Sequence, residues 1–175
     1  MADRKSFSGQ HRGLTAITAH HQDLVSSLTL YFSVISPYYS SRFAQYTVAE
    51  VTDELRERLD EVDRASSLDV LSSVEATFRI DYLQRCQRRL KDPISVSLRK
   101  IYRFKKNRAS LEDEIFDAWI QNSPGLTRLF SELRGAFKYR HWLAHGRYWT
   151  PKLGRRFDFP YIYELAEATF YQSPI

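Results

Sequence analysis

The 175-residue sequence predicts an all-α fold, arranged as an antiparallel helical bundle. Apolar residues recur at steps of three and four along most of the chain, which is the spacing of one face of a helix. Pro37, Pro93, Pro124 and Gly146 fall at the boundaries of these runs, where they start or end helices, and segments with the alternation of a strand are almost absent. A chain of this length can bury one core. We therefore expect residues 1–175 to form a single domain.

Two apolar stripes in the first third of the chain have recognisable boundaries. The first runs from residue 14 to residue 35, and Pro37 ends it. Thr47 and Glu50 then form the capping-box pattern, in which each side chain satisfies a backbone amide of the other residue. This pattern predicts the start of a second helix, whose stripe covers residues 48–62.

A longer helix is expected from about residue 68 to residue 91, with its apolar stripe turned inward. The Asp92-Pro93 pair restarts the chain, because proline suits the first turn of a helix but not its interior. Residues 94–107 then predict a basic helix. The inward stripe of the longer helix comprises Leu71, Val74, Phe78 and Tyr82.

The second half of the chain predicts further helices before its pattern changes. Ser110 with Asp113 caps a short, aromatic-rich helix. The last long helix follows, and Gly146 ends it as a left-handed residue. Residues 148–159 hold two short apolar segments around a central glycine, which predicts a small β-hairpin or an ordered loop. A final short helix closes the chain.

The net charge of +5 hides a strong segregation of charge along the sequence. Residues 50–81 sum to −6, whereas residues 85–108 sum to +9 and residues 134–156 to +7. Aromatic residues are interleaved with the bases in both positive segments. Such segments suit a polyanion such as RNA, because their cations displace the counterions of phosphates. The alternative is that these bases are solvated helix faces.

Composition excludes several classes of protein. Cys86 is the only cysteine, which rules out an internal disulfide framework and a cysteine-rich zinc site. The longest apolar stretch, around residues 28–35, is less than half of a membrane span. The first ten residues are too polar for a signal peptide. We therefore expect a cytoplasmic protein with no membrane partner and no cofactor.

The helix that ends at Gly146 departs from the core pattern in its last turns. Its apolar stripe continues, one turn further on, onto Arg140 and His141. Arginine is seldom buried without a partner, so its position needs an explanation. Either Arg140 is a buried structural cation, paired with Glu75, or the stripe emerges here into a cleft or a subunit interface.

His141 and His145 are four residues apart on one helix face, a spacing that can chelate a transition metal. The segment lacks the glutamate that a zinc protease uses as its base. Arg140 and Arg147 also place positive charge beside any bound ion. A metal-binding helical bundle is therefore the weakest of the functional alternatives, and we expect no metal site.

The segment Arg140-His141-Trp142-Leu143-Ala144-His145, followed by Gly146, resembles the R-x4-6-H motif of the HEPN superfamily of ribonucleases. In that family the residue after the arginine is typically Asn, Asp or His, and His141 fits. The resemblance covers the chain from about residue 68 onward. Two further segments look like the RiboL-PSP or ApeA-like branch, namely residues 75–82 and residues 145–149.

The resemblance implies a metal-independent endoribonuclease that uses the 2′-OH of RNA as nucleophile and leaves 2′,3′-cyclic phosphate and 5′-OH ends. His145 would act as general acid and base, and Arg140 would bind the scissile phosphate. His141 would orient the phosphate or hold Arg140. The resemblance also implies a homodimer with the active site at its interface. Phage defence or a toxin–antitoxin system is the expected setting, with an antitoxin or a defence-complex partner.

Further residues are expected to support this site. Glu75 and Arg79 are four apart and predict an ion pair within one helix. The alternative is that one of them contacts Arg140 or the phosphate. The residues that we expect to bind RNA are Arg99, Lys100, Arg103, Lys105, Lys106, Arg147, Tyr148 and Trp149.

One position departs from the family pattern. HEPN toxins paired with nucleotidyltransferase antitoxins often have a tyrosine two residues after the motif histidine. This chain has Arg147 there, and Tyr148 follows one residue later. Neutralisation by adenylylation of a motif tyrosine is therefore not expected. The second functional hypothesis is a non-catalytic HEPN-like module that binds RNA or a nucleotide and dimerises within a defence complex.

Overall fold

The computed structural model describes residues 7–173 and residue 175. Over these residues the chain is all-α: helices are joined by turns and loops, and no described residue lies in a strand. The predicted fold class is confirmed at this level. None of the helices in the described ranges is both long and apolar enough to cross a membrane.

Three helices, α1 (Leu14–Tyr31), α2 (Tyr39–Arg42) and α3 (Val48–Arg88), form the first half of the molecule. The predicted capping box at the start of α3 is confirmed. The hydroxyl of Thr47 accepts a hydrogen bond from the N–H of Glu50 at 3.3 Å. In return, Oε2 of Glu50 accepts one from the N–H of Thr47 at 2.7 Å. The box therefore satisfies two amides that the helix itself leaves unpaired.

The expectation of two separate helices over residues 48–91 is wrong, because α3 is one helix of 41 residues. Its apolar stripe weakens at Ser66 and Ser67, but no proline or glycine is present there to break the helix. Both serines are buried, and the Ser66 hydroxyl lies 3.1 Å from Nδ1 of His21 on α1. The small side chains of Ser66 and Ser67 therefore lie where α1 packs close to α3.

The second half of the molecule contains α4 (Pro93–Lys105), α5 (Phe116–Asn122), α6 (Thr127–Ala144) and α7 (Phe159–Gln172). A π-helical turn over Leu111–Ile115 leads into α5. The predicted start signals are confirmed. The Asp92 carboxylate accepts a hydrogen bond from the N–H of Ser95 at 3.0 Å. The Ser110 hydroxyl accepts one from the N–H of Asp113 at 3.2 Å.

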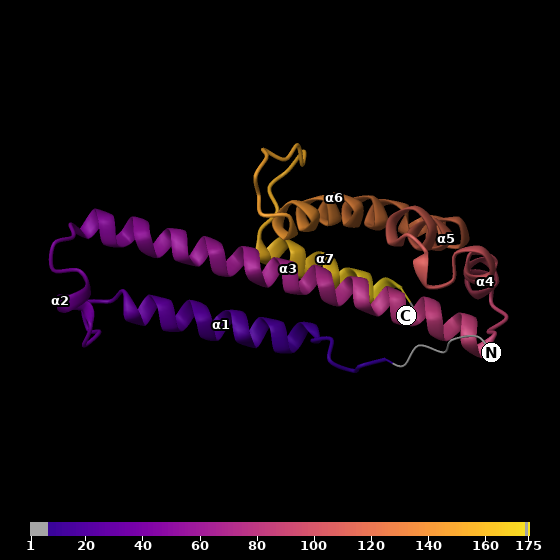
Figure 1. Cartoon of the computed structure of the whole chain (residues 1–175), viewed down its shortest axis with the longest axis horizontal. Helices are drawn as coiled ribbons and strands as arrows, with labels where there is room; N and C mark the ends of the chain where they lie inside the picture. The colour runs from indigo at the N-terminus through magenta and orange to yellow at the C-terminus, as the bar shows by residue number, and fades with distance from the viewer. Residues whose placement is uncertain (1–6, 174) are drawn as a thin grey trace.

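Residues 145–158, between α6 and α7, form a loop. The β-hairpin alternative is wrong, since no residue of this segment, all of which is described, lies in a strand. Contacts with the bundle help to fix the loop: the indole N–H of Trp142 donates to the carbonyl of Trp149 at 2.7 Å, and Phe157 is buried in the core. Figure 1 shows the loop standing out from the C-terminal end of α6.

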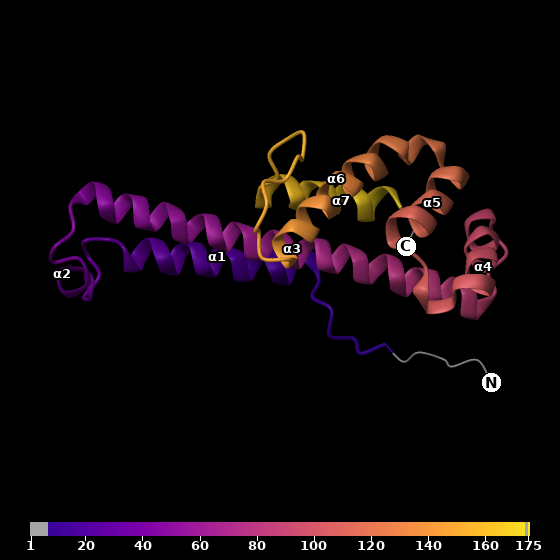
Figure 2. The same ribbon diagram turned by 45° about the horizontal axis from the view of Figure 1, so that its top comes forward.

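The long helix α3 organises the molecule (Figure 1). The helices α4 to α7 gather around its C-terminal half and, with the start of α1, form the bundle. Figures 1 and 2 both show that the N-terminal end of α3 projects away from the bundle, together with α2 and the end of α1. We call this projection, residues 28–55, the arm. The first predicted stripe is too long, because α1 ends at Tyr31 and Ile35 in the arm is 76% exposed.

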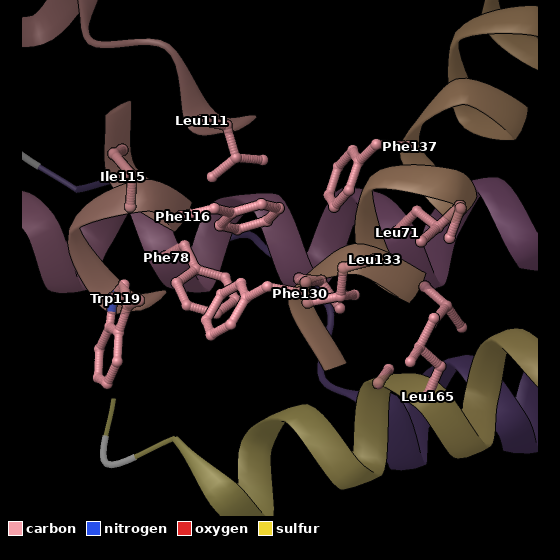
Figure 3. Close-up of a cluster of buried hydrophobic side chains, with 14 of the residues drawn as sticks. Leu71, Phe78, Leu111, Ile115, Phe116, Trp119, Phe130, Leu133, Phe137 and Leu165 are labelled. Atoms are coloured by element: carbon pink, nitrogen blue, oxygen red, sulfur yellow. The ribbon is translucent and has the colours of Figure 1, made fainter. Parts of the chain in front are cut away.

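The core of the bundle is aromatic (Figure 3). The ring of Phe78 on α3 meets the rings of Phe116 and Phe130 edge to face, with ring centres 5.1 and 5.7 Å apart. Trp119 is fully buried beside them. The predicted inward residues of α3, Leu71, Val74, Phe78 and Tyr82, are all buried. The arm has a separate small cluster formed by Phe32, Phe43 and Val51.

Candidate functional site

The candidate site lies at the C-terminal end of α6, where the buried stripe of this helix meets α3. Phe130, Leu133 and Phe137 of the stripe are buried. The next residue of the stripe, Arg140, keeps 32% of its side chain exposed. Its Nη2 lies 3.0 Å from Oε2 of Glu75 on α3. The stripe therefore ends on a half-buried arginine that is held by an acid from the neighbouring helix.

Glu75 holds two arginines at once. Its Oε1 accepts a hydrogen bond from Nε of Arg79 at 2.7 Å, while its Oε2 faces Arg140. Nη1 of Arg79 also donates to the carbonyl of Ala109 at 3.2 Å. The ion pair within α3 and the contact with Arg140, which the sequence offered as alternatives, are therefore present together. Two guanidinium groups around one carboxylate leave a net positive charge at this point.

Arg140 keeps hydrogen-bonding capacity after it has paired with Glu75. Its Nε is buried and has no hydrogen-bond partner among the residues that the structure describes. A buried donor without a partner costs about 1–3 kcal/mol, so such atoms are few in folded proteins. An anion would reach the exposed third of the Arg140 side chain rather than this buried nitrogen. It would meet a planar guanidinium that Glu75 already holds in place.

His141 and His145 present two imidazoles to solvent at the same end of α6. Their ring centres are 4.1 Å apart and their planes are tilted by 51°. His145 follows the last residue of the helix, and its backbone N–H donates to the carbonyl of His141 at 3.1 Å. Imidazole is the side chain best suited to exchange protons near neutral pH. A pair of proton acceptors and donors thus follows Arg140 within a few residues.

A Schellman motif ends α6 and turns the chain into the loop. The N–H of Gly146 donates to the carbonyl of Leu143 at 3.4 Å, and the N–H of Arg147 donates to the carbonyl of Trp142 at 3.1 Å. Gly146 has a φ of +79°, a left-handed conformation that glycine adopts without strain. The prediction that Gly146 ends this helix is confirmed.

The three loop residues that we expect to bind RNA differ in their surroundings. Nη1 of Arg147 lies 2.7 and 2.9 Å from the two carboxylate oxygens of Glu61 on α3. This hydrogen bonding lowers the pKa of Glu61 and raises the pKa of Arg147. Tyr148 is exposed, whereas Trp149 is half-buried with its ring centre 5.9 Å from that of His141. Arg147 is thus engaged, and the two aromatic rings flank the motif.

A hollow of about 350 Å³ lies beside His141, where the π-helical turn, α6 and the loop meet. Trp149 and the buried Phe137 contribute aromatic walls to it. Its three charged residues, Glu112, Lys138 and Lys152, were not singled out from the sequence. The two lysines have no distinguishing pattern within their basic segment. Glu112 stands on a π-helical turn, which has no sequence signature comparable to a capping box.

The basic residues of α4 lie away from this site. Figures 1 and 2 place α4 at the opposite end of the bundle from the C-terminal end of α6. Arg99 hydrogen-bonds the carbonyl of Leu90, and Lys105 forms an ion pair with Glu114 at 3.2 Å. Four of the bases that we expect to bind RNA are exposed here, namely Lys100, Arg103, Lys105 and Lys106. One chain therefore does not bring these bases together with Arg140.

Among the described residues, neither a cluster of metal ligands nor a reactive thiol adjoins the motif. Over residues 7–173 and 175, no three His, Cys, Asp or Glu side chains are grouped so that they could hold a metal ion. Cys86 is buried in the core of the bundle, and this burial raises the pKa of its thiol to about 11. The thiol is therefore protonated at neutral pH, and Cys86 is a packing residue.

Comparisons of the chain with protein-family models, with curated proteins and with solved structures found no match. The resemblance to HEPN ribonucleases therefore rests on the residues of the chain itself. Those residues are an arginine, two histidines and a helix-ending glycine between positions 140 and 146.

Proposed function

We propose that the chain is a metal-independent endoribonuclease of the HEPN type, acting in phage defence or in a toxin–antitoxin system. The proposal rests on the placement of Arg140, a half-buried arginine with an unpartnered buried Nε, next to the exposed pair His141 and His145. A purely structural arginine needs neither a spare donor nor two solvent-facing imidazoles beside it.

These residue types suit cleavage of RNA through its own 2′-OH. The 2′-oxygen attacks the neighbouring phosphorus and loses its proton, while the bond from phosphorus to the 5′-oxygen breaks. His145 takes the proton from the 2′-OH, and a protonated imidazole returns one to the leaving 5′-oxygen. Arg140 binds the phosphate and stabilises its extra negative charge in the transition state, and His141 orients the phosphate. The products carry 2′,3′-cyclic phosphate and 5′-OH ends.

A homodimer with the active site at its interface is part of the proposal. Arg140 and His145 are five residues apart, so an ideal helix aims them about 140° apart. A two-fold axis beside the end of α6 would place two copies of each residue on the two sides of one cleft. It would also bring a second exposed loop, with its Tyr148, to the same cleft. Light scattering that finds a monomer at working concentration contradicts this part of the proposal.

The decisive experiment is RNA cleavage in the presence of EDTA. The wild-type protein is expected to cut, whereas Arg140→Ala and His145→Ala are each expected to lose at least about 100-fold in rate, because each removes a group that acts in the transition state. Arg128→Ala is the matched control, since Arg128 is an almost fully exposed base on the same helix. Mass spectrometry of the products identifies the cyclic phosphate. Equal cutting by all variants would remove the catalytic assignment.

One observation favours the second candidate, a non-catalytic HEPN-like module that binds RNA or a nucleotide. Arg140 is already paired with Glu75, as a structural arginine would be. The exposed bases of α4 could still hold RNA, through contacts that weaken steeply with salt. The same assay separates the two candidates, because binding of RNA without cleavage supports the module.

A further inference from the structure

The hollow beside His141 has the size and the walls of a small-ligand site. Its volume of about 350 Å³ falls within the range of roughly 300–1,000 Å³ that small molecules occupy in proteins. Phe137 and Trp149 supply aromatic surface, and Leu153 supplies aliphatic surface. The rings of His141 and Trp149 are tilted by 54° to each other, so they form a corner rather than a closed stack. A flat ring can enter such a corner and lie against one aromatic face.

Glu112 contributes a carboxylate, which accepts hydrogen bonds, to the lining of the hollow. Its backbone carbonyl accepts a hydrogen bond from Nη2 of Arg134 at 2.7 Å, which fixes the turn that carries it. Its carboxylate makes no hydrogen bond and no ion pair with the described residues. Partial burial raises the pKa of this carboxyl, and the charges of Arg134 and Lys138 oppose that rise. The hollow is therefore lined by an acidic residue, Glu112, with which no described side chain pairs, beside aromatic walls.

A carboxylate selects among the four RNA bases by the donors that they offer. Guanine alone places two donors side by side on its Watson–Crick edge, at N1–H and at the exocyclic N2 amine. Adenine and cytosine pair one exocyclic amine with a ring nitrogen acceptor, and uracil has one N–H between two carbonyls. Two parallel acceptor oxygens match two parallel donors, and each of the other three bases would set at least one acceptor against them.

We propose that this hollow binds the base of a guanine nucleotide, with Glu112 accepting from N1–H and from the N2 amine. Lys138 and Lys152, which also line the hollow, would hold the phosphates on either side of this nucleotide. If the proposed ribonuclease function is right, the guanine stands next to the scissile phosphate, because His141 belongs both to the hollow and to the motif. The enzyme then cuts RNA beside guanines.

The test measures binding of GMP, AMP, CMP and UMP by the quenching of tryptophan fluorescence. Wild type is expected to bind GMP roughly 10-fold more tightly than the other three, as one bidentate contact allows. Glu112→Ala is expected to bind all four within about twofold of each other. Asp113→Ala is the matched control, since it removes a neighbouring acid that does not line the hollow, and it should keep the preference. Trp149→Phe should lose most of the quenching.

Binding and cleavage are scored separately, so that their failures can be told apart. Selective GMP binding without RNA cleavage keeps the guanine site and removes the ribonuclease function. Cleavage without any base preference, together with equal or absent nucleotide binding, keeps the ribonuclease and overturns the guanine site. A Glu112→Ala protein that is folded by circular dichroism and still prefers GMP also overturns it. Where both hold, an RNA with one guanine is cut beside that guanine.

Discussion

The arm and the bundle share helix α3, yet they cover their apolar side chains to different degrees. In the bundle, Phe78, Trp119 and Phe130 are fully buried. In the arm, Val34 and Val48 are 76% and 78% exposed. Apolar residues alone therefore do not make a core. They need neighbours on several sides, which the helices around the second half of α3 supply.

The difference in burial between the arm and the bundle indicates which residues of the candidate site are held by a packed part of the structure. Glu75 and Arg79 lie in the C-terminal half of α3, which α4 to α7 surround, and Glu61 lies on α3 between that half and the arm. Segments with few buried contacts open locally at lower free energy than segments in a packed core. Arg140 is thus anchored to the firmer part of α3, and the loop that carries Arg147 is tied nearer to the looser part.

The largest effect is expected from Phe78→Ala in the bundle. Removing this fully buried ring leaves a cavity among other rings and should cost about 3–5 kcal/mol of unfolding free energy. Phe43→Ala, in the small cluster of the arm, should cost about 2 kcal/mol, since fewer neighbours lose contacts. Urea denaturation followed by circular dichroism measures both. Equal losses would show that the arm is packed as firmly as the bundle.

An intermediate effect is expected from Glu75→Ala. Arg140 and Arg79 then lose their shared acid, which should cost about 1–2 kcal/mol because the pairs are only partly buried. RNA cleavage should fall as well, since Arg140 is no longer held. Glu57→Ala, an exposed acid in the part of α3 near the arm, is the control and should change stability by less than about 0.5 kcal/mol. Equal losses of stability in Glu75→Ala and Glu57→Ala would show that Glu75 does not anchor the two arginines.

The smallest effect is expected where the arm meets the bundle, in the pair formed by Arg147 and Glu61. Arg147 holds the pKa of Glu61 below its ordinary value of 4.5. A lowered carboxyl pKa means that the contribution of the pair is complete above about pH 4.5 and is lost as the pH falls through the lowered value. Tryptophan fluorescence, to which Trp149 in the loop contributes, should therefore change in acid in the wild type. The Glu61→Ala variant lacks the ion pair at every pH, so at neutral pH its fluorescence should already resemble that of the wild type in acid. If the variant and the wild type have the same fluorescence at neutral pH, the pair does not hold the loop.

Local signals in the sequence predicted much of the fold. The capping box at Thr47 and the stop at Gly146 depend on residues within a few positions of each other, and both are present. The continuity of α3 was missed, because the buried Ser66 and Ser67 interrupt the apolar stripe without breaking the helix. The exposure of Ile35 was not predicted, because this residue continues the apolar stripe although no other part of the fold covers it. A stripe indicates a face that can be buried, and the fold decides whether anything covers it.

Some parts of the candidate site could likewise be predicted from local sequence signals, whereas others depend on the fold. The motif at the end of α6 is contained in seven consecutive residues and could be found from the sequence. Glu75 lies 65 residues before Arg140, and the sequence could offer it only as one partner among alternatives. The hollow could not be predicted, since its walls come from the loop, from α6 and from the π-helical turn of Glu112, which only the fold brings together. The distance of α4 from the motif also became visible only in the fold.

The ion pair of Arg140 with Glu75 also has an entropic consequence. A free arginine side chain samples many rotamers, and fixing it costs about 2 kcal/mol. Here that freedom is largely lost when the protein folds, because Glu75 on a packed helix restricts the guanidinium. A phosphate that binds later meets a side chain already in position. Its affinity can therefore be more than 10-fold higher than for a mobile arginine, since 1.4 kcal/mol corresponds to a factor of ten.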